Sequence, residues 1–322
     1  MYQIYCQNNL FKIQYKIISF FIITILIGCN NKSTNNYENI IIDRFEKKFF
    51  NIQPDSLKIL KNQYPYLFPS NFSDEEWLNI KNDSIRKIIF NETQVEFKND
   101  YLRKDISKLY YRLSDQFSNF NSPKIITINN GLDFQYKLID IDSIVLLSLD
   151  CYLDNYELYK AFPDYISQKM NKNYLIRDLA EKLISRYVTY PTNRQFLDKI
   201  IYYGKVYNLM INNLDFGESN ALYYNEKEIL WAKDNEKEVW KFFIENEILF
   251  NTSNILVERF INFGPYSKFG ISTDYESTPM IGKWIGYKIV KSYLKSNNKT
   301  IEEILNMNEY ELYLNSNYKP GL

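Results

Sequence analysis

PKIITINNGLDFQYKLIDIDSIVLLSL, residues 123–149, decides the fold class because it interrupts a chain that otherwise has helical periodicity. Three segments within it are rich in β-branched and apolar residues, as strands are: Lys124–Ile128, Phe134–Ile139 and Ser143–Leu149. Asn129-Asn-Gly131, between the first two, is a turn signal. We therefore expect these segments to form a small antiparallel sheet.

Helices are expected on both sides of this stretch. Asn39–Phe50 has the pattern of a short helix or strand, and Ser73-Asp-Glu-Glu76 is a capping box that starts a helix. Thr300–Glu303 is a second capping box near the C-terminus. The apolar periodicity predicts helices to about Asn91, then at 100–117, 155–170, 174–187, 193–212, 225–233, 236–249, 253–260, 279–296 and 301–315. The predicted fold class is α+β, mostly α-helical, with a small antiparallel sheet followed by a helical bundle.

Two helices of the predicted bundle carry internal glycines. Arg194–Ile211 is apolar around most of its circumference, as expected of a buried central helix, and it contains Gly204. Glycine inside a helix is about 1 kcal/mol less favourable than alanine, which a close crossing of two backbones would offset. Gly282 and Gly286 lie four residues apart on a later helix, and this spacing also favours close backbone approach.

The N-terminal residues have the pattern of a lipoprotein signal peptide. An apolar run, Ile17–Ile27, follows Lys12 and Lys16 and is shorter than the roughly 20 residues that span a bilayer. It ends in Leu26-Ile-Gly-Cys29, a lipobox, in which the cysteine thiol receives diacylglycerol and the peptidase cleaves before it. The alternative is an uncleaved anchor helix that ends in cysteine.

The resulting domain prediction has three parts. Residues 1–28 are a signal peptide, 29–38 are a lipidated flexible tether, and 39–322 are a single α+β domain. Lipid on Cys29 would hold the chain on the inner or outer membrane of a bacterial envelope, facing the periplasm. The tether is short and polar, so the folded domain would sit close to the membrane surface.

Composition excludes several classes of protein. The chain has 39 Lys and Arg against 39 Asp and Glu, so no excess of positive charge indicates nucleic-acid binding. It has no histidine, so neither a Ser-His-Asp triad, a Cys-His pair nor a histidine zinc site can form. Once Cys6 has left and Cys29 is acylated, Cys151 remains alone, and we expect a buried, inert thiol without a disulfide.

Carboxylate pairs are the remaining candidates for chemistry. Asp140 and Asp142, and Asp150 and Asp154, lie beside the predicted sheet. Such pairs can catalyse glycoside hydrolysis without histidine, or bind Ca²⁺ or Mg²⁺. Asp at these positions more often caps a helix or shapes a turn. We therefore expect no catalytic residue, no metal site and no cofactor.

Several segments, taken in order after the lipobox, carry a resemblance to a known family. They begin with Leu147-Ser-Leu-Asp-Cys-Tyr-Leu153, Tyr159-Lys-Ala-Phe-Pro-Asp-Tyr-Ile166 and Phe196-Leu-Asp-Lys-Ile-Ile-Tyr-Tyr-Gly-Lys205. They continue with Trp231…Asn235-Glu236…Trp240, Phe263-Gly-Pro-Tyr-Ser-Lys-Phe269, Pro279-Met-Ile-Gly-Lys-Trp-Ile-Gly-Tyr-Lys-Ile-Val290 and Tyr318-Lys-Pro320. Together these segments resemble the gliding motility lipoprotein GldB family of Bacteroidetes.

The resemblance implies an envelope lipoprotein of the gliding machinery and its associated type IX secretion. It also implies a zincin-like architecture, related to HExxH metallopeptidases, without the zinc site. The Ile200–Lys205 stretch would occupy the position of the zinc helix, where it offers no imidazole.

The sequence thus predicts a non-catalytic lipoprotein that acts by protein–protein contact with envelope proteins of the gliding and secretion machinery. The alternative is a lipoprotein that binds a peptide or glycan in a degenerate peptidase cleft. A deep cleft beside the strand near Leu147, lined by Tyr202 and Tyr203, would favour this alternative.

Overall fold

The computed structural model describes residues 40–98 and 100–320. The predicted signal peptide, the lipid attachment at Cys29 and the tether to residue 38 therefore lie outside the described residues.

The sheet has four strands: β1 (Ile42–Arg44), β2 (Lys124–Ile128), β3 (Leu138–Ile141) and β4 (Ile144–Ser148), in the order β1-β2-β4-β3. β2 pairs in parallel with both β1 and β4, and only β3 and β4 are antiparallel. The expectation of an antiparallel sheet was therefore wrong, and the sheet is mixed. β1 lies in the Asn39–Phe50 segment, which was expected to form a short helix or strand.

A buried carboxylate holds the turn that follows β2. Asp150 accepts hydrogen bonds from the backbone N–H groups of Asn130 at 3.2 Å, Gly131 at 2.8 Å and Leu132 at 2.9 Å. These bonds hold the Asn-Asn-Gly turn at the ends of β2 and β4, and the turn does not close a hairpin. The chain then forms a 3-10 turn, η4 (Phe134–Tyr136), before β3, and the hairpin turns at Asp142, which has a φ of 49°.

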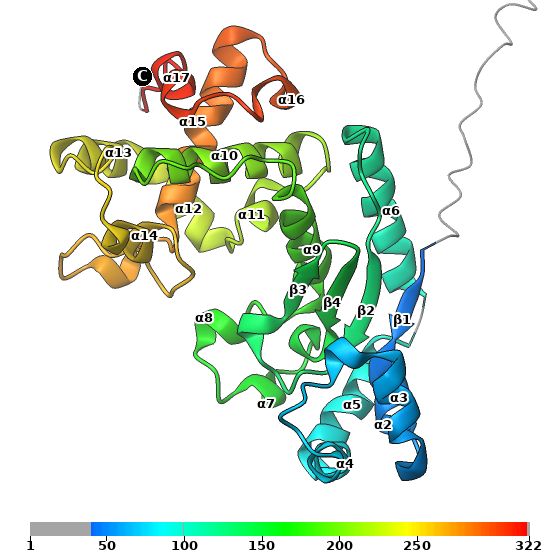
Figure 1. Ribbon diagram of the computed structural model, residues 1–322. Helices are drawn as coiled ribbons and strands as arrows, with labels where there is room; N and C mark the ends of the chain where they lie inside the picture. The colour runs from blue at the N-terminus through cyan, green and yellow to red at the C-terminus, as the bar shows by residue number, and fades with distance from the viewer. Residues whose placement is uncertain (1–39, 99, 321–322) are drawn as a thin grey trace, which may run out of the picture. The chain divides into compact units, whose positions relative to one another are not determined.

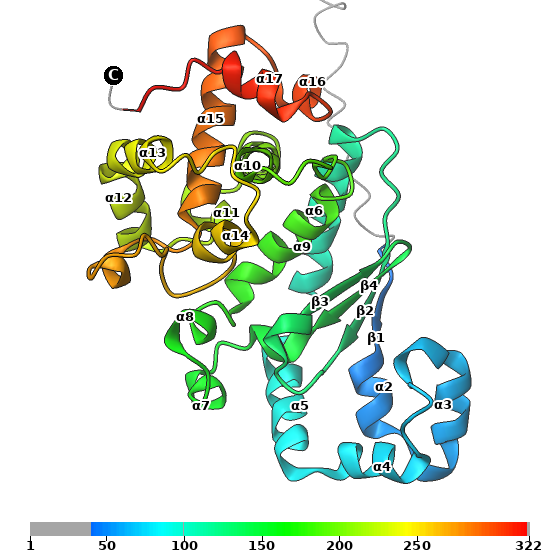
Figure 2. The ribbon, with the colours of Figure 1, turned by 60° about the vertical axis from the view of Figure 1, so that its left-hand side comes forward.

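Helices cover both faces of the sheet. Because neighbouring residues of a strand point to opposite faces, each strand contributes side chains to both layers. Ile126 and Leu146 pack with α2 (Phe45–Asn51) and α3 (Leu57–Gln63) in one hydrophobic cluster. Ile125, Val145 and Leu147 lie in the larger cluster, with α6 (Tyr101–Gln116) and α9 (Leu175–Ile184). Figure 2 shows these two helix pairs on either side of the sheet.

The helical part is built around two helices that cross in contact, α10 (Phe196–Asn212) and α15 (Ile281–Asn297) (Figure 1). A Cβ atom on Gly204 would lie 2.3 Å from the carbonyl oxygen of Gly286. A Cβ atom on Gly286 would lie 1.8 Å from the carbonyl oxygen of Ile200. The expectation that these glycines allow close backbone approach is confirmed.

The other helices follow the sequence prediction with two main differences. Both capping boxes are present, Ser73 with Glu76 and Thr300 with Glu303. The expected helix at 155–170 is two single turns separated by Pro163, and the helix expected at 301–315 is broken into two. These and the remaining helices are α4 (Asp74–Asn82), α5 (Ser84–Glu96), α7 (Tyr156–Tyr159), α8 (Asp164–Ser167), α11 (Glu218–Ala221), α12 (Glu226–Asp234), α13 (Glu236–Glu245), α14 (Asn254–Phe260), α16 (Ile301–Ile304) and α17 (Glu309–Leu314). The fold class, α+β and mostly helical, is confirmed.

Within residues 40–98 and 100–320, no helix has the length and apolarity needed to cross a bilayer.

Candidate functional site

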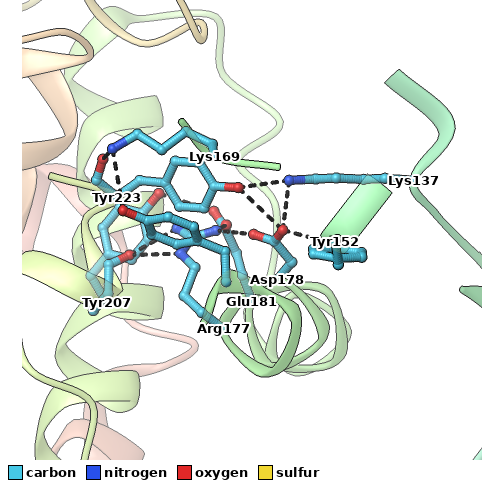
Figure 3. A network of polar contacts seen from close by, with 10 residues as sticks. Lys137, Tyr152, Lys169, Arg177, Asp178, Glu181, Tyr207 and Tyr223 are labelled. Carbon is cyan, nitrogen blue, oxygen red and sulfur yellow. Dashed lines mark hydrogen bonds and ion pairs between the residues drawn. The ribbon is translucent and has the colours of Figure 1, made fainter. Parts of the chain in front are cut away.

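One face of α9 carries charge in the interior of the protein. Its apolar residues, among them Leu179 and Leu183, are fully buried in the core. Arg177, Asp178 and Glu181 lie on the other face and point toward α10, β3 and the turn after α11 (Figure 3). Buried charges are rare unless they are paired, so their partners define the site.

Asp178 joins three parts of the chain. Its Oδ2 atom accepts hydrogen bonds from Lys137 Nζ at 2.5 Å, Tyr152 OH at 2.9 Å and Tyr223 OH at 3.2 Å (Figure 3). Lys137 immediately precedes β3, and its ammonium also donates to Tyr223 OH at 2.7 Å. The edge of the sheet is therefore fixed to α9 through an ion pair. Burial, followed by the charge of Asp178, raises the pKa of the Tyr152 and Tyr223 hydroxyls, so both remain donors at neutral pH.

Arg177 neutralises Glu181, the second carboxylate on this face of α9. Its guanidinium forms ion pairs with Asp178 and Glu181 and donates to the carbonyl oxygen of Ala221 at 2.8 Å. Glu181 also accepts a hydrogen bond from Tyr207 OH at 2.9 Å. Burial alone would raise the pKa of Glu181, but the charge of Arg177, followed by Lys283 and the Tyr207 hydrogen bond, lowers it to about 2.

A cavity of about 930 Å³ lies against this network. One wall is the segment from Leu132 to Leu138, which leads into β3, and another is the charged face of α9. The volume falls in the range of pockets that enclose a small ligand. The remaining walls are mainly apolar or aromatic and include Phe162, Ile166, Tyr203, Tyr223, Phe263 and Met280.

Lys283 of α15 also lines the cavity. Its ammonium lies 4.3 Å from the centroid of the Tyr203 ring and 5.9 Å from that of Tyr207. Burial lowers the pKa of Lys283 to about 8, since the opposing effect of Glu181 is only partial and Arg177 adds to the lowering. Across the described part of the chain, its ammonium makes neither a hydrogen bond nor an ion pair.

Comparison with known proteins gives the family. Residues 29–320 match the family described as gliding motility protein GldB. The chain belongs to the GldB family. It is thereby associated with gliding motility and with a lipoprotein family of that machinery. No curated protein and no solved structure matches the chain.

The resemblance places a zinc-helix position at Ile200–Lys205, and the zincin-like architecture stays a prediction for this GldB-family chain. The Ile200–Lys205 stretch does not face the cavity except through Tyr203, because Ile200 and Gly204 pack against α15. Lys205 is buried and bonded to Glu309 at 3.0 Å and to the carbonyl oxygen of Met307 at 2.6 Å.

The row of charged residues that faces the cavity lies on α9 and contains no zinc-binding side chain at its first position. Arg177, Asp178 and Glu181 have the i, i+1, i+4 spacing of the functional residues in an HExxH helix. These residues do not fit a zinc ion, because a guanidinium stands at the first position and already binds the carboxylate at the last. Among the described residues, no group of three or more Cys, Asp or Glu side chains is arranged to hold a metal.

The other residues singled out from the sequence have structural roles. Asp140 is paired with Arg186, and Asp154 accepts a hydrogen bond from Asn171 at 3.1 Å. Asp150 pins the 130–132 turn, and burial raises its pKa despite these hydrogen bonds. Cys151 is fully buried, as expected, and burial raises the pKa of its thiol well above the ordinary value, so the thiolate is disfavoured.

The row of charged residues on α9, Arg177, Asp178 and Glu181, was not predicted from the sequence. Of the two tyrosines that were expected in a cleft, only Tyr203 lines the cavity, because Tyr202 packs against Tyr190. One signal was available: in Leu175–Ile184 the charged residues recur with the spacing of a metallopeptidase helix beside a strongly apolar face.

Proposed function

We propose that this chain is a non-catalytic, lipid-anchored envelope protein that supports gliding motility and type IX secretion by holding a peptide segment of a partner protein in the cavity beside β3. The observation that carries the proposal is a preformed cavity against the edge strand of the sheet.

The backbone of β3 supports a peptide as the occupant. β3 is an edge strand, and the N–H of Ser148 donates to the carbonyl of Lys137 at 2.9 Å. Because hydrogen-bonded and non-bonded pairs alternate in an antiparallel ladder, Leu138 and Asp140 direct their backbone groups away from β4. An extended peptide can pair with such an edge and place alternate side chains in the adjoining cavity. A glycan would not use these backbone groups in this regular way, so we favour a peptide over the glycan alternative.

The electrostatics support a binding role without catalysis. A general acid or base needs a carboxyl group that is available to a substrate and has a pKa near the working pH. Asp178 is occupied by Lys137 and two hydroxyls, and Glu181 is occupied by Arg177 and Tyr207. Both carboxylates instead fix the walls of the cavity.

Anchoring at Cys29 is supported by two independent features. The lipobox predicts Cys29 as the first residue of the mature chain, and the family match begins at the same residue. Acyl chains such as palmitate on Cys29 would hold the domain at the inner or outer membrane, where the cavity can meet envelope proteins.

A gliding host that lacks its own family member provides the test. The wild-type gene should restore colony spreading, whereas Gln135→Trp, which places an indole at the exposed rim of the cavity, should not. Ile59→Trp is the matched control, because Ile59 of α3 is exposed and lies outside both the cavity and β3. Full spreading with Gln135→Trp, at normal protein level, would refute use of the cavity.

A further inference from the structure

The cavity contains a cation that lacks a counterion. Of the other cations that line it, Lys137 is paired with Asp178, Arg177 is paired with both carboxylates of α9, and Lys182 is exposed to solvent. Lys283 differs from all three, because it is only partly exposed and no group in the described residues accepts a hydrogen bond from its ammonium. Its ammonium lies over the face of the Tyr203 ring, which attracts a cation but carries no net charge.

A partly buried Lys283 ammonium without a counterion is energetically unfavourable in the protein without a ligand. An ammonium in an apolar, aromatic cavity loses part of its hydration, and the usual compensation is a carboxylate. Glu181 lies near enough to influence Lys283, yet its oxygens are already used by Arg177 and Tyr207. A ligand that brings its own anionic group would supply the missing partner.

The walls also limit what kind of chain can enter. Residues 132–137 do not continue β3, since they form a turn and a 3-10 segment that wall one side of the cavity. An extended chain paired with β3 therefore cannot run on as a strand past Lys137. A chain that runs antiparallel to β3 and stops there presents its C-terminus to the cavity.

We infer that the cavity binds the C-terminus of a polypeptide, with the terminal carboxylate paired to the ammonium of Lys283 and the last apolar side chains held between Phe134, Phe162 and Phe263. This inference rests on the proposed peptide-binding function and adds the part of the peptide that is recognised. Lys283 serves as a point charge with three donors, so one ammonium can bind a single terminal carboxylate without a second cation.

Paired peptide pools test the inference. The full-length protein in lipid nanodiscs is incubated at pH 7 with N-acetylated pentapeptides of mixed Ala, Val, Leu, Ile and Phe sequence. One pool ends in free carboxylates and the other in amides, and peptides retained after gel filtration are counted by mass spectrometry. A hydrogen bond to a charged group predicts retention of the free acids at least about tenfold above the amides.

Variants on one helix assign the effect to a residue. Lys283→Met should reduce the acid-to-amide ratio to about one, whereas Lys283→Arg, which keeps the charge, should retain a preference for acids. Lys295→Met is the matched control, because Lys295 is an exposed residue of the same helix that does not line the cavity. If Lys283→Met does not fold, the acid-to-amide ratios of the wild type and of Lys283→Arg still test the inference.

Four outcomes are distinguishable. A tenfold ratio that Lys283→Met abolishes supports the inference. Equal retention of both pools overturns carboxylate recognition and leaves peptide binding in place. Retention of neither pool overturns the proposed function as well. Retention of dodecanoate, offered to the protein in a parallel incubation, without either pool indicates a lipid acid and overturns both.

Discussion

Replacing Gly286 by alanine is a direct test of how α10 and α15 pack. The new Cβ would lie 1.8 Å from the carbonyl oxygen and 2.4 Å from the carbonyl carbon of Ile200. Both are backbone atoms of a helix, so no side-chain rotation relieves the clash. The helices would have to separate by about 1.5 Å to restore van der Waals distances. Separation would loosen the packing of Trp284 and Ile285, which are fully buried on the same helix.

The expected loss of stability follows from two opposing terms. Alanine gains about 1 kcal/mol in helix propensity over glycine. Overpacking a core typically costs about 1–3 kcal/mol and more where the backbone must move. Because the clash here involves backbone on both sides, we expect a net loss of about 3 kcal/mol. For a domain of about 280 residues that corresponds to a decrease in Tm of roughly 5 °C.

Thermal and urea unfolding followed by circular dichroism would measure the effect. Gly217→Ala is the control, because a Cβ at Gly217 would meet no atom within 4 Å. Its free energy of unfolding should stay within about 0.5 kcal/mol of the wild type. If Gly286→Ala were as stable as Gly217→Ala, the close crossing of α10 and α15 would be refuted.

Three further predictions concern the site. Glu181→Gln should lower the free energy of unfolding at pH 7 by up to about 3 kcal/mol, because the pKa of Glu181 in the folded protein is lowered to about 2. In urea titrations, this difference from wild type should fade as the pH drops from about 4.5 toward 2. The acid-to-amide peptide ratio should decline as pH rises from 7 to 9.5, because Lys283 loses its proton near pH 8. The groups that face Lys283 are Glu181 and Arg177 of α9 and the Tyr203 and Tyr207 rings of α10. A ratio that stays constant to pH 10 would contradict this prediction. Asp150→Ala should destabilise the protein by about 3 kcal/mol or more in urea unfolding, because three backbone N–H groups lose their acceptor.

Features set by neighbouring residues could be predicted from the sequence. The capping boxes at Ser73 and Thr300 depend on four consecutive residues and are present in the structure. The glycines of α10 and α15 revealed a close crossing, because a buried helix rarely keeps glycine without a reason. The family was also recognisable, since its ordered segments extend along the whole mature chain.

Features set by distant residues could not be predicted in the same way. The parallel pairing of β2 and β4 is accompanied by hydrogen bonds from Asp150 to a turn about twenty residues earlier in the sequence, which no local pattern indicates. The charges of α9 have the spacing of an exposed, salt-bridged face, and only the tertiary structure shows that Lys137 and Tyr223 cover them. Lys283 gives no local signal, because its isolation results from the way α9, α10 and α15 pack together.

Photo-crosslinking in living cells tests most directly whether the cavity holds the end of a partner protein. Benzoylphenylalanine would replace Lys182, an exposed residue of α9 that lines the cavity, and Ile59 of α3, exposed on the other side of the sheet, would be the control. We predict that position 182 crosslinks to the C-terminal peptide of an envelope protein, and that Lys283→Met in the same chain removes the product. Internal peptides at position 182, or the same products from position 59, would contradict the account.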